Sequence, residues 1–221
     1  LDAARTMAED TAEPFRVALR AAHLGIEDRY HNRNAPKRGA KSGWPDLDAA
    51  LGGGWIPGRL SVVAARPGMG KTAWGLATAV RVARSGVPVF FASLEMDRVQ
   101  LAERYLASVG GVDASRIATG VLDGIDFARL QRATSDGVIL PLHIDDTPTQ
   151  TVDRIAGSVR RWRSKSAPVE KHPLCVVLVD YLQLVKPRDR KMPREQQVAE
   201  ISSALAVAAR TIPGAHFIAL A

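Results

Sequence analysis

The amino-acid sequence predicts an α/β fold with a mostly parallel central sheet and helices on both faces, preceded by one separate helix. Two observations predict it. After Gly43, short apolar runs alternate with segments whose apolar residues recur every three or four positions, as in domains of strands and crossover helices. The composition, 46% hydrophobic and 24% charged over 221 residues, fits one globular domain and excludes disordered, collagen-like and disulfide-dense classes.

The first predicted element is an amphipathic helix from Pro14 to about Arg29. Its apolar residues recur at helical spacing and are Phe15, Ala18, Leu19, Ala22 and Ile26. Residues 31–41 then lack apolar periodicity and contain proline and glycine, which indicates an exposed segment. We therefore expect residues 1–42 to form a linker helix and an exposed basic linker. The helix must bury its apolar face on its own domain or on a neighbouring subunit, and the sequence leaves both open.

Residues 43–221 are expected to form the α/β domain. Apolar runs predict strands at 60–65, 87–93, 142–145, 174–180 and 216–221. Helical patterns fall at 70–85, 97–109, 113–120, 125–135, 151–163 and 195–210, with Asp97 and either Thr149 or Thr151 as caps. The last strand ends with the chain, so we expect this domain to be incomplete at its C-terminal end.

Cysteine usage and hydropathy bound the cellular setting. The single cysteine, Cys175, excludes an internal disulfide and lies in an apolar run, which indicates a buried thiol in a reducing compartment. No apolar stretch reaches the roughly 18 residues that a membrane span needs, and the N-terminus lacks signal-peptide features. The histidines show no metal-ligand spacing, so no zinc site is expected. We expect a cytoplasmic protein without a membrane partner.

A phosphate-binding loop is the clearest motif. Residues 65–72, Ala-Arg-Pro-Gly-Met-Gly-Lys-Thr, lie between a predicted strand and a predicted helix, the context in which such a loop works. Gly68 and Gly70 let the backbone curl so that N–H groups and the helix N-terminus point at phosphate oxygens. Lys71 brings catalytic positive charge to the terminal phosphates, and the Thr72 hydroxyl is a ligand for Mg²⁺. The first position is Ala65, where the simple motif has glycine. The residues expected to bind nucleotide are Arg66, Pro67, Gly68, Met69, Gly70, Lys71, Thr72 and Ala73.

Two acidic residues after predicted strands are candidates for hydrolysis. Asp180 ends a strongly apolar strand, where P-loop enzymes place the carboxylate that holds the metal shell. Glu95 follows another strand, and the carboxyl ends of neighbouring parallel strands converge on one crevice. We expect Thr72 and Asp180 to hold Mg²⁺ and Glu95 to orient or deprotonate the attacking water. Asp145 and Asp146 also end a strand, and are either turn formers or members of the metal shell.

Positive charge is concentrated in the last third of the chain. The net charge is +7, and residues 151–221 carry 12 Lys or Arg against 6 Asp or Glu. One cluster comprises Arg160, Arg161, Arg163 and Lys165; the other comprises Lys186, Arg188, Arg190, Lys191 and Arg194. Each is either a solvated face or a surface for an anionic polymer.

These motifs, in this order, resemble the RecA-like motor domain of the DnaB-type hexameric replicative DNA helicases. The resemblance runs from about Ser42 to the last residue and rests on residues 42–48, 52–58, 64–72, 93–96, 144–148, 179–184 and 200–203. The helix near the N-terminus is similar to the tail of that family's interdomain linker. The resemblance implies hydrolysis of Mg-ATP coupled to translocation on single-stranded DNA and duplex unwinding, with the segment from Lys186 to Arg194 gripping the DNA backbone.

The resemblance also implies partners. It implies a hexameric ring, formed through the linker helix and the motor interfaces, with a primase and a helicase loader as further partners. The family's polar sensor, arginine finger and several DNA-contacting residues correspond to positions beyond Ala221, so we expect weak turnover from this chain alone.

Two other functions fit part of the pattern. A RadA- or KaiC-like ATPase of recombination or signalling shares the glycine-rich introduction and the phosphate loop, but residues 93–96 and 180–183 resemble the helicases more closely. A nucleotide-gated assembly module would need no hydrolysis, and the presence of Glu95 argues against it.

Overall fold

The computed structural model describes residues 14–31, 39–187 and 192–221. It contains two compact units: helix α1 belongs to one, and the residues from Gly39 onward belong to the other. Each unit is described by itself.

Helix α1 spans Phe15–His31, within two residues of the predicted bounds. Its large apolar side chains are exposed: Phe15 is 75% exposed, Leu24 64% and Ile26 55%. Exposure of such an apolar face to water costs free energy. That the chain's own domain or a neighbouring subunit covers this face stays a prediction.

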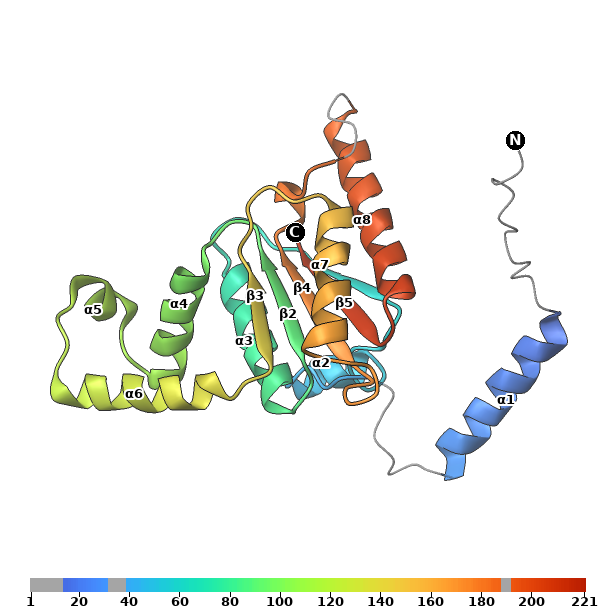
Figure 1. The fold of residues 1–221 in the computed structure, drawn as a ribbon, viewed down its shortest axis with the longest axis horizontal. Helices are drawn as coiled ribbons and strands as arrows, with labels where there is room; N and C mark the ends of the chain where they lie inside the picture. The colour runs from blue at the N-terminus through green and yellow to red at the C-terminus, as the bar shows by residue number, and fades with distance from the viewer. Residues whose placement is uncertain (1–13, 32–38, 188–191) are drawn as a thin grey trace. The chain divides into compact units, whose positions relative to one another are not determined.

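The second unit contains a five-stranded sheet in which every pair of neighbours is parallel, as predicted. The strands are β1 Leu60–Val63, β2 Val89–Ser93, β3 Leu142–Asp145, β4 Cys175–Asp180 and β5 Ala215–Leu220. Their order across the sheet is β1-β5-β4-β2-β3, so β4 lies in the middle between β5 and β2. The carboxyl ends of β1, β2 and β4 therefore meet at one edge of the sheet (Figure 1).

Helices cover both faces of this sheet (Figure 1). The helices of this unit are α2 Pro45–Ala50, α3 Lys71–Arg84, α4 Arg98–Gly110, α5 Ala114–Thr119, α6 Gly124–Val138, α7 Val152–Lys165 and α8 Arg194–Thr211, with a 3₁₀ turn at Leu182–Leu184. Of these, α5 and α6 contact α4 and extend to one side of the sheet (Figure 1). Predicted caps are confirmed for two of them: Asp97 accepts hydrogen bonds from the N–H groups of Val99 and Gln100, and Thr151 accepts one from that of Arg154.

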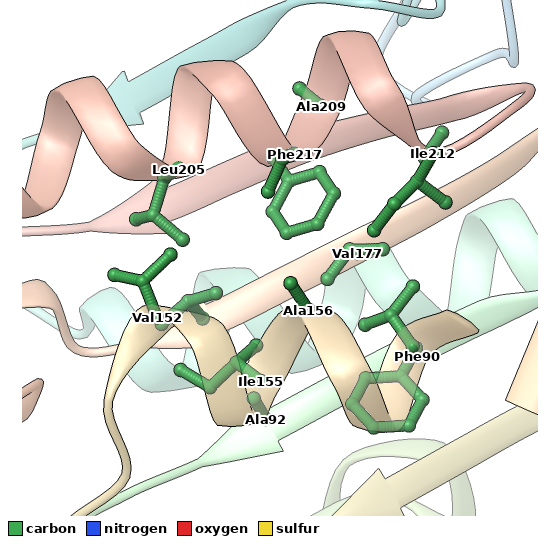
Figure 2. Packing of buried hydrophobic residues seen from close by; sticks show 14 of the residues in the cluster. Phe90, Ala92, Val152, Ile155, Ala156, Val177, Leu205, Ala209, Ile212 and Phe217 are labelled. Carbon is green, nitrogen blue, oxygen red and sulfur yellow. The ribbon is translucent and has the colours of Figure 1, made fainter. Parts of the chain in front are cut away.

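The pleat of the strands divides the core into two layers. On β4, Val177 and Val179 face α7 and α8, whereas Val176 and Leu178 pack in the cluster that includes α3. Figure 2 shows Phe217 of β5 packed near Leu205 of α8 on the first of these faces. Asp180 has the same parity as Leu178, so its side chain lies on the α3 face of the sheet.

The prediction of an exposed linker is wrong at the C-terminal end of that segment. Ala40 is 3% exposed and pairs in antiparallel fashion with Trp55, and the Ser42 N–H donates to Asp48 Oδ1 at 2.8 Å. Asp48 belongs to helix α2, which the hydropathy pattern does not predict. The polar composition of this segment predicts exposure, but backbone pairing buries the segment. A Cβ on Gly54 would lie 2.3 Å from the Ala40 carbonyl oxygen, so this pairing requires glycine.

The first basic cluster is not a uniform surface. Arg160, Arg161 and Lys165 are exposed, but Arg163 is 4% exposed and donates hydrogen bonds to the carbonyls of Ala167 and Pro213. It is a structural residue that ties the end of α7 to the turn before β5.

No helix within the described ranges is long and apolar enough to cross a membrane.

Candidate nucleotide-binding site

The phosphate loop connects β1 to α3. Gly68 and Gly70 have φ angles of +79° and +83°, in the left-handed region that glycine adopts without strain. Gly70 is the N-cap of α3, and no side chain of the described residues caps this helix N-terminus. The first N–H groups of α3 are therefore directed at the space above the loop, where an anionic group would complete their hydrogen bonding.

A cavity of about 610 Å³ lies over this loop. Its lining includes Arg66, Pro67, Gly68, Gly70, Lys71, Thr72 and Ala73, which are seven of the eight residues predicted to bind nucleotide. Met69 is the exception: its side chain is 73% exposed and does not line the cavity. The Lys71 ammonium donates to the Ala65 carbonyl at 3.2 Å and lies 5.5 Å from the centre of the Tyr181 ring.

Asp180 ends β4 and directly precedes Tyr181, which lines this cavity, whereas Asp180 itself does not line it. Its side chain is fully buried, and neither carboxylate oxygen has a hydrogen-bond partner among the described residues. Burial raises the pKa of Asp180, and the neighbouring Glu95 charge raises it further, whereas the Thr72 hydroxyl and Lys71 lower it. A buried, unsatisfied carboxylate beside a hydroxyl and a lysine is a site where a cation would be favoured.

Glu95 lies in the turn that follows β2, exposed to solvent and lining the same cavity as Lys71 and Thr72. The pairing of β2 with β4 places Ser93 opposite Asp180, and the Leu94 N–H donates to the Asp180 carbonyl at 2.8 Å. The sheet therefore brings Glu95 and Asp180 close to each other, as expected for strands whose carboxyl ends converge, although only Glu95 lines the cavity.

Three polar residues line the cavity without having been predicted from the sequence as site residues: Arg104, Tyr181 and Gln183. Arg104 projects from α4, and its charge lowers the pKa of Asp180. Nothing in the local sequence separates Arg104 from the other surface arginines; only the packing of α4 beside α3 brings it to the site. Tyr181 and Gln183 closely follow the predicted metal-binding carboxylate, and that proximity is the one signal that could have found them.

A family model, the DnaB-like helicase C terminal domain, matches residues 39–220. The chain belongs to this family. It is 37% identical to the replicative DNA helicase DnaB of Synechocystis over 90% of this chain and 22% of that protein. It is 36% identical to DnaB of Geobacillus stearothermophilus over 84% of this chain and 40% of that protein. The chain thus spans less than half the length of both relatives.

The fold of this DnaB-like chain agrees with solved structures. A DnaB-like replicative helicase, whose structure was described together with its interactions with primase, superimposes with a TM-score of 0.79 at 28% identity. The match covers 90% of this chain and 47% of that one. The predicted RecA-like architecture is confirmed.

The DnaB-like domain also carries part of the second basic cluster. Lys186 is half-buried, and its N–H donates to the Gln150 carbonyl at 2.9 Å. The exposed Arg194 donates to the Gln183 carbonyl at 2.6 Å, so it is tied to a residue of the nucleotide cavity. The predicted DNA-binding residues Arg188, Arg190 and Lys191 lie outside the described residues.

Proposed function

We propose that residues 39–221 are the ATPase motor of a replicative DNA helicase, which couples hydrolysis of Mg-ATP to movement on single-stranded DNA and to unwinding of the duplex. The observation that carries this proposal is one cavity that an uncapped helix N-terminus, Lys71 and Glu95 line, with the buried carboxylate of Asp180 close to all three. Membership of the DnaB-like family supports the choice of this motor over other P-loop enzymes.

The donor set at the cavity fits Mg²⁺. Hard oxygen ligands suit this ion, and Thr72 and Asp180 offer a hydroxyl and two unpaired carboxylate oxygens. When bound, the ion supplies positive charge to the phosphate oxygens and holds water around them. Within the described ranges no three His, Cys, Asp or Glu side chains gather as metal ligands, so we infer that substrate oxygens and water complete the shell.

The protein groups divide the remaining work. The first N–H groups of α3 bind phosphate oxygens, and Lys71 leaves the Ala65 carbonyl to stabilise the charge that develops on the terminal phosphate. Glu95 orients the attacking water and accepts its proton. Arg104, which also lines the cavity, adds positive charge near the terminal phosphate.

DNA is proposed to contact the basic segment that starts at Lys186 and ends at Arg194. Lysine and arginine side chains there would grip the phosphate backbone without reading bases. The hydrogen bond from Arg194 to the Gln183 carbonyl gives this segment a direct connection to the nucleotide cavity.

We further propose that α1 is a linker helix whose exposed apolar side chains are covered in a homo-oligomer, a hexameric ring formed through α1 and the motor interfaces. A primase and a helicase loader are proposed as partners, and the cytoplasm as the site of action. A RadA- or KaiC-like recombination or signalling ATPase is not favoured, because the family model and curated relatives are replicative helicases.

ATP hydrolysis by the chain, measured with and without an oligo-dT strand at several salt concentrations, tests the proposal. We expect Mg²⁺-dependent hydrolysis, oligo-dT binding that weakens with salt, and faster hydrolysis in the presence of the strand. Hydrolysis that ignores DNA at every salt concentration would instead favour the signalling ATPase.

A further inference from the structure

The first half of the turn that carries Glu95 is fixed by hydrogen bonds within the turn and by one hydrogen bond to β4. Ser93 Oγ donates to the Met96 carbonyl at 2.6 Å, which closes the turn on itself, and the Met96 N–H donates back to Ser93 Oγ at 3.3 Å. The Leu94 N–H donates to the Asp180 carbonyl at 2.8 Å. These bonds fix the entry to the turn, but they leave its exit toward α4 to other contacts.

The end of the Glu95 turn, where the chain enters α4, is fixed by the carboxylate of a residue that follows β3. Asp146 follows β3, and its Oδ2 accepts hydrogen bonds from the Arg98 N–H at 3.0 Å and from Arg98 Nε at 2.9 Å. Its Oδ1 accepts a third from Arg98 Nη2 at 2.5 Å. Arg98 is the first residue of α4 and lies three positions after Glu95.

Three bonds to one carboxylate distinguish this pair from an ordinary surface ion pair. Exposed pairs contribute little because two flexible side chains must be held in place. Here the Arg98 side chain is 68% exposed, but the Asp146 side chain is only 14% exposed, the arginine fork is bidentate, and the third donor is backbone. The Arg98 guanidinium accordingly holds the pKa of Asp146 well below its usual range.

The same contacts argue against a place for Asp146 in the metal shell, one of the two uses that the sequence left open. Both of its carboxylate oxygens accept bonds from Arg98, and Asp146 does not line the nucleotide cavity. Its neighbour Asp145 accepts a hydrogen bond from the Thr147 N–H at 3.1 Å, as a turn former does. A structural link to the Glu95 turn is therefore the use that the geometry supports.

We propose that Asp146 is a positioning residue for hydrolysis: by binding Arg98 it fixes the exit of the turn, and with it the place of Glu95 over the phosphate loop. This inference rests on the proposed role of Glu95. It predicts that loss of the Arg98–Asp146 link slows the chemical step and leaves nucleotide binding intact, because the loop, Lys71 and Thr72 are not touched.

Single-turnover hydrolysis and ATP affinity, measured for Asp146→Asn and Arg98→Gln, test this. Displacement of a reacting group by about 1 Å can reduce a rate about 100-fold, so a reduction of about tenfold or more is expected. The ATP dissociation constant should change less than about twofold. Asp146→Glu, which keeps the charge and can still bind Arg98, should recover part of the rate.

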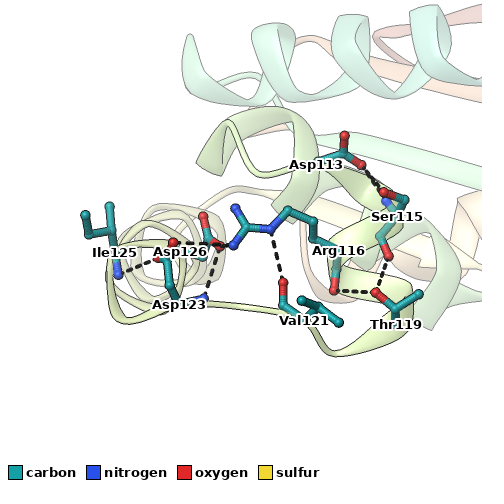
Figure 3. Close-up of polar contacts among 8 residues, drawn as sticks. All are labelled: Asp113, Ser115, Arg116, Thr119, Val121, Asp123, Ile125 and Asp126. Atoms are coloured by element: carbon teal, nitrogen blue, oxygen red, sulfur yellow. Dashed lines mark hydrogen bonds and ion pairs between the residues drawn. The ribbon is translucent and has the colours of Figure 1, made fainter.

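A matched control is offered by another ion pair of the same domain. Arg116 of α5 contacts Asp126 at 2.7 Å and Asp123 at 3.3 Å (Figure 3). Asp123→Asn removes one carboxylate partner of Arg116, as Asp146→Asn removes that of Arg98, and neither Asp123 nor Arg116 lines the nucleotide cavity. Its hydrolysis rate should match that of the unmodified chain.

The decisive comparison places Asp146→Asn in a Glu95→Gln background. If Asp146 acts by positioning Glu95, its substitution has no further effect there; if it only supports the fold, it reduces the residual rate by the same factor in both backgrounds, which would overturn the inference. An unchanged rate in Asp146→Asn alone, with Glu95→Gln inactive, would overturn this inference and leave the proposed function standing. Full activity in Glu95→Gln would overturn both.

Discussion

Ser93 of β2 and Asp180 of β4 lie directly opposite each other in the parallel pairing of the two strands. Both side chains are buried on the α3 face of the sheet, Ser93 at 1% exposure and Asp180 at 0%. This register is what joins two segments 87 residues apart, since Ser93 closes the turn that presents Glu95 while Asp180 lies close to Thr72 of the phosphate loop.

Asp180 is expected to destabilise the nucleotide-free fold while being required for binding of Mg-ATP. Burial raises the pKa of Asp180 in the folded chain above its unfolded value, so ionisation disfavours the folded state. Without nucleotide, the part of the unfolding free energy that depends on Asp180 should be highest below the unfolded pKa. It should be lost as the pH rises through the folded pKa. Asp180→Asn should remove this loss and stabilise the nucleotide-free chain near neutral pH by about 1–3 kcal/mol, while abolishing Mg²⁺-dependent ATP binding.

Chemical denaturation between pH 3.5 and 8, with and without Mg-ATP, checks this expectation. The two chains should converge in stability at the acid end and separate as the pH rises. A destabilised Asp180→Asn chain at neutral pH would show that the carboxylate has stabilising partners.

Arg104 is expected to act on the terminal phosphate. It lines the cavity together with Glu95 and Lys71. Arg104→Ala should reduce the hydrolysis rate by about 100-fold, the usual cost of removing one group that stabilises developing charge. Arg132→Ala removes an exposed arginine from α6 and serves as the control. Equal rates for both variants would exclude Arg104 from the chemistry.

Arg163 is expected to be important for stability and not for DNA. It is buried and donates to the carbonyls of Ala167 and Pro213 at 2.5 and 3.2 Å. Arg163→Ala leaves both carbonyls without this donor, so the unfolding free energy should fall by about 2–4 kcal/mol. The exposed Arg161, changed to alanine, should alter it by less than about 0.5 kcal/mol. Urea denaturation of both variants measures the difference.

Lys186 and Arg194 should respond differently to substitution. Lys186→Ala should weaken oligo-dT binding and reduce the salt slope by about 0.7 for each phosphate group that the side chain neutralises. Arg194→Ala also removes the donor to the Gln183 carbonyl, so it should change ATP hydrolysis without DNA as well. Titration of oligo-dT by fluorescence anisotropy, with Lys165→Ala as control, measures DNA binding by both variants. ATP hydrolysis without DNA then distinguishes Arg194→Ala from Lys186→Ala. Unchanged DNA binding in both variants would exclude this segment as the DNA contact.

Much of the fold could be predicted from the sequence because its strands are short apolar runs and several of its helices, α4 and α7 among them, begin at side-chain caps. β3 was predicted at its observed bounds, 142–145, and Asp97 and Thr151 mark helix starts through local hydrogen bonds. Helix α2 and the pairing of Ala40 with Trp55 were missed, because this segment is buried by backbone bonds and not by apolar periodicity.

The candidate site follows the same division. Gly68, Lys71 and Thr72 belong to a motif whose spacing reflects its mechanism, so a single sequence suffices to find them. The roles proposed for Arg104 and Asp146 depend on which helices and strands become neighbours, and nothing in the local sequence distinguishes these two residues. Arg163 shows the reverse error: a cationic cluster predicts a surface, yet Arg163 is buried where the end of α7 meets the turn before β5.

The role of Glu95 is the centre of the proposed mechanism, and ATP binding and hydrolysis by Glu95→Gln test it most directly. Glu170→Gln, an exposed glutamate outside the cavity, is the matched control. We expect Glu95→Gln to bind Mg-ATP with an affinity close to that of the unmodified chain and to lose hydrolysis, because the phosphate loop is intact and only the water-activating carboxylate is gone. Hydrolysis in Glu95→Gln equal to that of the Glu170→Gln control would contradict this mechanism.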